Sequence, residues 1–254
     1  MLKGVGEYLM KSVVIATIHS WNIDLIKRCR DALKGYNVKL ITTKEELTFE
    51  FLSQLQPEYV FFPHWSWLIP PEIYSNFRCV VFHMTDLPFG RGGSPLQNLI
   101  TRGISETKIS AIAVTEEIDA GSIYLKEPMS LYGSAEEIYM RAAKIIFTKM
   151  IPQIVKDCPK PVPQTGDATF FIRRTPEMSE LSPNMTLEQI FDYIRMLDAD
   201  GYPHAYIKLG TKIIEFSRAK QTSDSILADV KIKEAVPDDG DWRFNHSGGC
   251  GPSR

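Results

Sequence analysis

The chain lacks most of the features that mark membrane, metal-binding, disulfide-rich or dinucleotide-binding proteins. None of its apolar runs approaches the ~20 residues that a membrane-spanning helix needs, and residues 1–8 lack the apolar core of a signal peptide. It has only four cysteines among 254 residues, with neither metal-ligand nor disulfide-framework spacing. It contains no glycine-rich dinucleotide fingerprint and no P-loop. We therefore expect a cytoplasmic protein in a reduced setting, with no bound metal and no membrane association.

An excess of basic charge is also missing. The formal net charge is −2 at pH 7, whereas a protein that grips a nucleic acid mainly through its phosphates usually carries a basic excess or a basic face. The average charge does not exclude a local basic patch, but it gives nucleic-acid binding no support. A composition of 44% hydrophobic and 24% charged residues is ordinary for a globular protein, and the length allows one main domain with an appendage.

Short apolar runs alternate with helical patterns up to residue 158. Continuous apolar or β-branched runs predict strands, and apolar residues at helical spacing predict helices. Strands that alternate with helices indicate an α/β fold with a doubly wound, mostly parallel sheet. The predicted strands are residues 12–17, 37–42, 59–62, 79–82 and 108–114, and the predicted helices are residues 21–33, 48–55, 70–75, 95–102 and 134–155.

The remainder of the chain predicts a small mixed α/β appendage. Residues 159–167 are rich in proline and predict a linker between a core at 10–158 and a subdomain at 168–234. In that subdomain we expect an edge strand at 168–172, a helix at 186–197, a hairpin at 204–216 and a further strand at 225–232. Residues 235–254 are polar and turn-rich, and we expect a disordered tail there.

The most informative segment follows the apolar run 79–82. His83 stands at the carboxyl end of this predicted strand, where open α/β sheets place their chemistry, and a loop rich in glycine and proline comes next. Asp119 offers a carboxylate in a second turn. A histidine and a carboxylate on two rigid loops are typical of an acid–base site. The alternatives are a core histidine bonded to backbone carbonyls and a turn aspartate bonded to its own backbone.

The order and spacing of several motifs resemble the formyltetrahydrofolate-dependent formyltransferases, a family that includes methionyl-tRNA formyltransferases and sugar N-formyltransferases. The similarity runs from residue 12 to residue 216. The motifs that carry it are His83, Leu87-Pro88, Arg91-Gly92, Pro95, Asp119-x-Gly121, Pro163-Gln164-x-Gly166-x-Ala168-Thr169 and Gly201-Tyr202-Pro203-His204-Ala205-Tyr206. The resemblance implies a Rossmann-like formyltransferase core at 10–158. It also implies that 10-formyltetrahydrofolate donates a formyl group to an amine.

The resemblance also assigns roles to individual residues. His83 would assist proton removal or bond the reacting oxygen, and Asp119 would orient it. Asp86 and Asn98 would meet the acceptor, although Asp86 can equally be a solvated loop carboxylate or a helix cap. For the aromatic stretch the alternative is plain core packing, and for Arg91 it is a loop-stabilising salt bridge. The expected folate-binding residues are Phe62, His64, Trp65, Trp67, Leu68, Arg91, Gly92, Val114, Glu117 and Ile118.

One position departs from the family pattern. The family usually has an asparagine two residues before the histidine, and here that residue is Val81. Loss of one oxyanion donor typically costs roughly 100- to 1,000-fold in rate. The candidate replacements are Asn98, His64 and a backbone amide. A different acceptor geometry, or a folate-binding module that transfers nothing, would also account for Val81.

The sequence favours a small amine acceptor, such as an amino sugar carried on a nucleotide. The resemblance implies that relatives acting on initiator tRNA have a longer segment before the histidine, with a basic loop, and a larger, basic C-terminal domain. Here the segment before His83 is compact, and the part after the linker is short and has only one adjacent arginine pair, Arg173-Arg174. Methionyl-tRNA is the alternative acceptor, because short chains with this core also resemble enzymes of that name. By analogy, a homodimer through the small C-terminal region is a further expectation.

Overall fold

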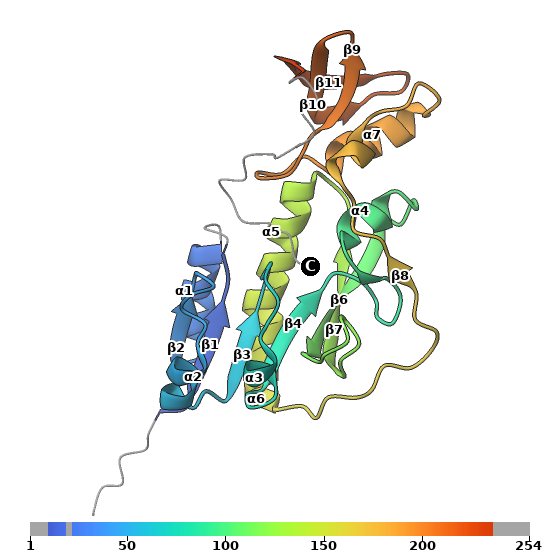
Figure 1. Ribbon diagram of the computed structural model, residues 1–254. Coiled ribbons are helices and arrows are strands. Elements are labelled where there is room, and N and C mark those ends of the chain that lie inside the picture. Colours follow the sequence, from blue (N-terminus) through green and yellow to red (C-terminus); the bar gives the residue numbers. More distant parts are fainter. Residues whose placement is uncertain (1–9, 19–21, 236–254) are drawn as a thin grey trace, which may run out of the picture.

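The computed structural model describes residues 10–18 and 22–235, and its centre is a six-stranded sheet (Figure 1). The strand order is β2-β1-β3-β4-β6-β7, in which β1 to β4 run parallel while β6 is antiparallel to β4 and β7 to β6. This confirms the doubly wound, mostly parallel sheet. The strands are β1 (Ser12–Ala16), β2 (Asn37–Ile41), β3 (Tyr59–Phe62), β4 (Cys79–His83), β6 (Glu106–Ala113) and β7 (Ile123–Ser130).

Helices cover both faces of this sheet, which is why its central strands are apolar throughout. One core lies between the sheet and α1, α4, α5 and α6, and a second, smaller core lies between the opposite face and α2 and α3. Strands buried on both faces read as continuous hydrophobic runs. The helices are α1 (Asn22–Ala32), α2 (Phe49–Leu55), α3 (Pro71–Tyr74), α4 (Pro95–Ile100), α5 (Ala135–Ile145) and α6 (Ile151–Asp157), with a π-helical turn at Ile146–Met150 between the last two.

The predicted strands and helices of this region are confirmed, with boundaries shifted by a few residues. The strand β7 was missed. Its sequence lacks period-two alternation and contains Pro128, and proline is tolerated in a sheet mainly on an edge strand, which β7 is. The single helix predicted at 134–155 is continuous but widens into the π-helical turn two residues before Pro152.

The appendage holds a three-stranded antiparallel sheet of order β11-β10-β9, with the helix α7 beside it (Figure 1). The predicted hairpin, helix and last strand are therefore confirmed. The edge strand expected at 168–172 is shorter, and it pairs with a two-residue strand of the His83 loop instead of joining the large sheet. The elements are β5 (Arg91–Gly92), β8 (Phe170–Phe171), a 3-10 turn (Pro176–Ser179), α7 (Leu187–Arg195), β9 (Ala205–Leu209), β10 (Lys212–Gln221) and β11 (Ile226–Glu234).

Several expectations concern features other than strands and helices. Cys29 and Cys79 are buried in the two cores, where desolvation raises the pKa of each thiol to about 12. The tail expected at 235–254 lies outside the described residues, apart from Ala235. Within the described ranges no helix has the length and apolarity to cross a membrane. In the same residues, no three His, Cys, Asp or Glu side chains gather closely enough to hold a metal ion.

Candidate active site

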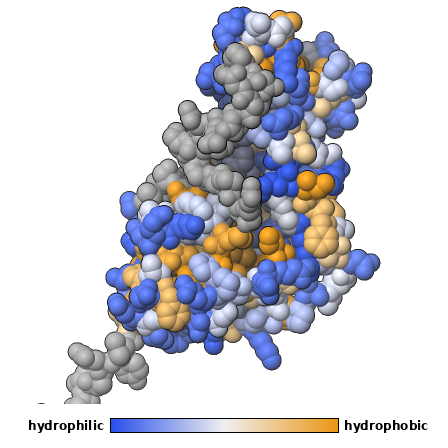
Figure 2. All heavy atoms as spheres, viewed as in Figure 1, coloured by the Kyte–Doolittle hydropathy of each residue, from blue (hydrophilic) through white to orange (hydrophobic). Residues whose placement is uncertain are grey.

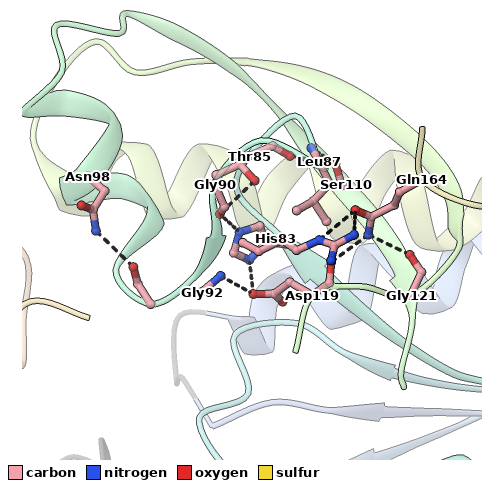
Figure 3. A network of polar contacts seen from close by, with 12 residues as sticks. His83, Thr85, Leu87, Gly90, Gly92, Asn98, Ser110, Asp119, Gly121 and Gln164 are labelled. Atoms are coloured by element: carbon pink, nitrogen blue, oxygen red, sulfur yellow. Dashed lines mark hydrogen bonds and ion pairs between the residues drawn. The ribbon is translucent and has the colours of Figure 1, made fainter. Parts of the chain in front are cut away.

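His83 ends β4 in the middle of the large sheet, and both of its ring nitrogens face polar atoms (Figure 3). Its side chain is largely buried. Nε2 lies 2.7 Å from the carbonyl oxygen of Gly90, and Nδ1 lies 3.4 Å from Oδ2 of Asp119. Because a carbonyl oxygen only accepts hydrogen bonds, Nε2 carries a proton and donates it to Gly90. The structure therefore brings the two predicted catalytic side chains together, as the sequence motifs predicted.

Asp119 is held in a turn whose backbone is unusual. Its φ is 57°, in the left-handed region that side chains other than glycine rarely adopt. Two residues later, a Cβ atom on Gly121 would lie 1.7 Å from the carbonyl oxygen of Ala113, so the turn packs directly on β6. The backbone N–H of Gly92 donates to Oδ2 of Asp119 at 2.9 Å. The carboxylate is thus fixed between the His83 ring and the loop that follows β4.

Arg91 has a structural role in this geometry. Its Nη1 forms an ion pair with Glu117 at 2.9 Å, and its Nε and Nη2 both donate to Oε1 of Gln164 in the linker, at 3.2 and 2.9 Å. All three guanidinium nitrogens are engaged by protein groups. This supports the loop-stabilising alternative for Arg91, and Glu117 is the other half of the same bridge.

The two residues expected to meet the acceptor are both engaged by other side chains or by backbone. The Asn98 amide donates to the carbonyls of Gly93, Ser94 and Ile172, so no donor is left for an oxyanion or a substrate. This corrects the role expected for Asn98. Asp86 is 42% exposed and pairs with Lys108 and Lys126. Although partial burial alone would raise it, the hydrogen bonds and charges of these two lysines bring the pKa of Asp86 below its usual value.

Part of the aromatic segment after β3 forms a wall beside the site. Trp65 packs in the smaller core together with Val81 and Val114, and its ring lies 4.8 Å from that of Trp67, at 72°. Val81 comes two residues before His83 in β4 and therefore lies on the same face of the sheet. Phe62 is 2% exposed and belongs to the core, so its side chain offers no surface to a ligand. That corrects its assignment as a folate-binding residue.

Of the other predicted folate-binding residues, Leu68 and Ile118 are exposed, whereas the His64 ring contacts a helix. Leu68 and Ile118 are large apolar side chains that are 61% and 63% exposed, one on each of the loops that follow β3 and β6. The ring of His64 instead lies edge-on to that of Tyr139 in α5. Within the described residues, the buried Nε1 of Trp65 has no hydrogen-bond partner. Apolar side chains with an unsatisfied donor among them fit a flat heterocycle that carries polar edge atoms.

The surface of the larger body differs in hydropathy from that of the small C-terminal part. On the face shown in Figure 2, hydrophobic residues gather near the middle of the larger body, with hydrophilic residues around them. The small C-terminal part is mostly hydrophilic on the same face.

Sequence reasoning overlooked two linker residues that contact the site. Gln164 bonds Arg91 and the Asp119 turn, and Thr169 bonds the backbone of Gly90 and Arg91. Both belong to the Pro-Gln-x-Gly-x-Ala-Thr motif: Gln164 lies in the predicted linker at 159–167, and Thr169 lies two residues beyond it. The motif therefore contained the information needed to predict these contacts, because its glutamine and threonine are side chains that can hydrogen-bond to neighbouring loops.

Comparison with known proteins supports the resemblance in both parts of the chain. The profile of the formyl transferase family matches residues 11–152, more than half of the chain. A second profile, of the methionyl-tRNA formyltransferase C-terminal domain, matches residues 176–233. Among curated relatives, the methionyl-tRNA formyltransferase of Lactobacillus acidophilus is 31% identical over 156 residues, which are 59% of this chain and 49% of that protein. The Bacillus mycoides enzyme of that name is 24% identical over 211 residues, 80% of this chain and 67% of that protein. The chain thus spans between half and two thirds of these relatives.

Solved structures extend the similarity to almost the full chain. A methionyl-tRNA formyltransferase from Clostridium thermocellum superposes with a TM-score of 0.86 at 58% identity, over 88% of this chain and 99% of that one. A sugar N-formyltransferase from a Shewanella species shares the fold, with a TM-score of 0.67 at 16% identity, over 85% of this chain and 100% of that one. The matching profile, the structural neighbour of similar length and the paired His83 and Asp119 lead to one conclusion. This chain belongs to the formyl transferase family.

Proposed function

We propose that this chain transfers a formyl group from 10-formyltetrahydrofolate to the amino group of methionyl-tRNA. The observation that carries the reaction type is the contact between His83 and Asp119 at the carboxyl end of β4. The similarity to the Clostridium thermocellum enzyme, at 58% identity over nearly its whole length, supports the choice of acceptor. The sequence alone favoured a small amine, and this similarity favours the alternative acceptor.

The reaction needs a group that takes up a proton. An amine that attacks a formyl carbon must lose a proton, and the folate nitrogen that leaves must gain one. Nε2 of His83 is already committed to the Gly90 carbonyl, and Oδ2 of Asp119 faces His83 and Gly92. Oδ1 of Asp119 takes no part in these two contacts. We assign proton uptake to this oxygen, while Oδ2 on the other side of the carboxyl group stays beside His83 and Gly92.

The formyl donor fits the wall beside this pair. When bound, 10-formyltetrahydrofolate supplies the formyl group. Trp65, Trp67 and Val114 would line its flat ring, and Leu68 and Ile118 would cover it from the two loops. Since the Asn98 amide is engaged, a backbone amide is the replacement we favour for the oxyanion donor missing at Val81.

The test is an assay with several acceptors. The protein is incubated with 10-formyltetrahydrofolate and, separately, methionyl-tRNA, free methionine or a nucleotide-linked amino sugar, and release of tetrahydrofolate is followed. We expect release with methionyl-tRNA and its loss, by about 100- to 10,000-fold, in His83→Ala and Asp119→Asn. Asp157→Asn, an exposed aspartate at the end of α6, is the matched control and should keep full activity.

The other outcomes separate the alternatives. Release with the amino sugar alone would assign the chain to the sugar N-formyltransferases. Folate binding without release for any acceptor would support the non-catalytic module that Val81 suggested. Full activity of His83→Ala would remove the proposed site. The homodimer and a small-molecule acceptor stay predictions.

A further inference from the structure

We infer that Gln164 is a positioning residue for the His83–Asp119 pair, so that the linker is a working part of the active site. This inference rests on the proposed function, because it concerns how the same pair is held. Figure 3 shows Gln164 reaching toward Gly121 beside Asp119, on the side away from His83. Gln164 belongs to the chain between the two parts of the molecule, far along the sequence from the residues that it contacts.

Every polar atom of the Gln164 amide is used. Oε1 accepts from Nε and Nη2 of Arg91, and Nε2 donates to the carbonyl oxygens of Asp119 and Gly121, at 2.7 and 2.9 Å. One side chain therefore joins the loop after β4 to the turn that carries the catalytic carboxylate. An amide is suited to this position, since it must accept on one side and donate on the other.

These bonds close a ring around the site. Gln164 bonds the backbone of Asp119, the Asp119 carboxylate accepts from the N–H of Gly92, and the neighbouring Arg91 returns to Gln164. Glu117 adds a second connection between Arg91 and the same turn. A closed ring of hydrogen bonds restricts the position of the carboxylate more than any single bond does, because each member limits the movement of the next.

Thr169 attaches the linker to the other partner of the pair. Its hydroxyl accepts from the N–H of Gly90 at 2.7 Å, and its carbonyl accepts from the N–H of Arg91 at 2.9 Å. The carbonyl of the same Gly90 accepts the Nε2 proton of His83. The linker therefore fixes the residue that orients the imidazole, as Gln164 fixes the turn that orients the carboxylate.

Gln164→Glu is the sharpest test, because it keeps the shape and the acceptor for Arg91 but removes both donors. A carboxylate would then face two carbonyl oxygens, and the Asp119 turn would shift. We expect kcat to fall about 100-fold, the loss that a displacement near 1 Å can cause, with little change in either KM. The pH dependence of kcat should also shift, because the contact between Asp119 and His83 changes. Gln153→Glu, on the exposed side of α6, is the matched control.

The result that overturns the inference is a Gln164→Glu variant with the kcat and pH profile of the parent while His83→Ala is inactive. A lower melting temperature with an unchanged pH profile would also overturn it, since that is the mark of a merely structural residue. Activity in His83→Ala would refute the proposed function first. If Gln164→Glu did not fold, Thr169→Val would replace it, with the same shift in pH profile expected because Gly90 loses its hydroxyl partner.

Discussion

At the scale of single residues, the site depends on close backbone contacts more than on unusual side chains. Gly121 lies against the carbonyl of Ala113, and Gly92, with a φ of +105°, lies against the carbonyl of Phe171. In both places a Cβ atom would overlap a backbone oxygen that cannot easily move. The glycines two residues after Asp119 and directly after Arg91 are therefore requirements of packing.

Gly121→Ala should destabilise the protein by about 3 kcal/mol, the upper end for an added methyl group in a packed region. The reason is the 1.7 Å approach of the new Cβ to the Ala113 carbonyl. Gly103→Ala is the control, since that position has open space and a φ of +70°, and only backbone strain of about 1 kcal/mol is expected there. Denaturant unfolding measures both, and equal losses would contradict the steric explanation.

Asp86→Asn should lower the free energy of unfolding only at pH values at which the Asp86 carboxyl group is ionised. Its pKa is lowered by Lys126 and Lys108 below the ordinary 3.8, so its stabilisation is fully present above that value and is lost as the pH falls through the lowered pKa. The carboxyl is 42% exposed, so the effect at pH 7 should stay under about 1 kcal/mol. Denaturant unfolding of the variant and the parent at pH 7 and at pH 2 measures this difference in stability. A difference that persists at pH 2 would disprove the ion-pair explanation.

The sequence predicted that His83 and Asp119 lie together, but not the groups that hold the neighbouring residues. His83 and Asp119 were found because the histidine follows a continuous apolar strand and the aspartate precedes a glycine at the family's spacing. The engagement of Asn98 and Arg91 was not predictable in the same way. Their partners, Ile172 and Gln164, are more than seventy residues away along the chain, and only the folded path of the linker brings them near.

At the scale of the elements, most boundaries follow from local chemistry. Thr186 begins α7 with a capping box, in which its hydroxyl accepts from the N–H of Gln189 and the Gln189 side chain accepts from the N–H of Thr186. Ser134 and Glu137 make the same arrangement at the start of α5. Such caps are readable from sequence, because the pattern is short and the bonds are local.

Thr186→Ala should lower the stability of the C-terminal part by about 0.5–2 kcal/mol, since it removes the oxygen that accepts from Gln189. Thr186→Ser keeps that oxygen and should cost much less. Thermal unfolding followed by circular dichroism compares the two variants. If serine and alanine were equally destabilising, the capping bond would not be the cause.

Strand directions were harder to predict than strand positions. The run at 108–114 was expected as one more strand of a mostly parallel sheet, yet β6 is antiparallel to β4, although a segment that contains α4 connects them. The direction of β6 depends on the end of the sheet at which this connection re-enters it, and no local sequence pattern specifies that end. The missed β7 completes the same region, as the edge strand that pairs with β6.

At the scale of the whole molecule, the charge distribution limits how an acceptor is held. Four cations of the small sheet are paired with neighbouring carboxylates, namely Lys208 with Glu180, Lys212 with Glu234, Lys233 with Glu215 and Arg218 with Asp229. With a net charge of −2, the chain has little surplus positive charge to offer to phosphates.

If methionyl-tRNA is the acceptor, as proposed, its affinity should depend only moderately on salt. Two or three phosphate contacts would reduce the affinity about ten- to forty-fold between 50 and 200 mM salt, whereas six to ten contacts would reduce it by about 10³–10⁵. Measuring KM for the tRNA over this range tests the expectation. A steep dependence would mean that the enzyme uses a basic surface that these ion pairs do not account for.

The pairing of β8 with β5 also bears on how this protein can be dissected. A fragment that ended near residue 158, where the sequence places the boundary of the core, would keep His83 and Asp119 but would leave Arg91 and Gly92 without their neighbouring strand. The smallest active fragment should therefore extend at least to Phe171. Fragments that separate the two parts of the molecule, for engineering or crystallisation, should be cut beyond that residue.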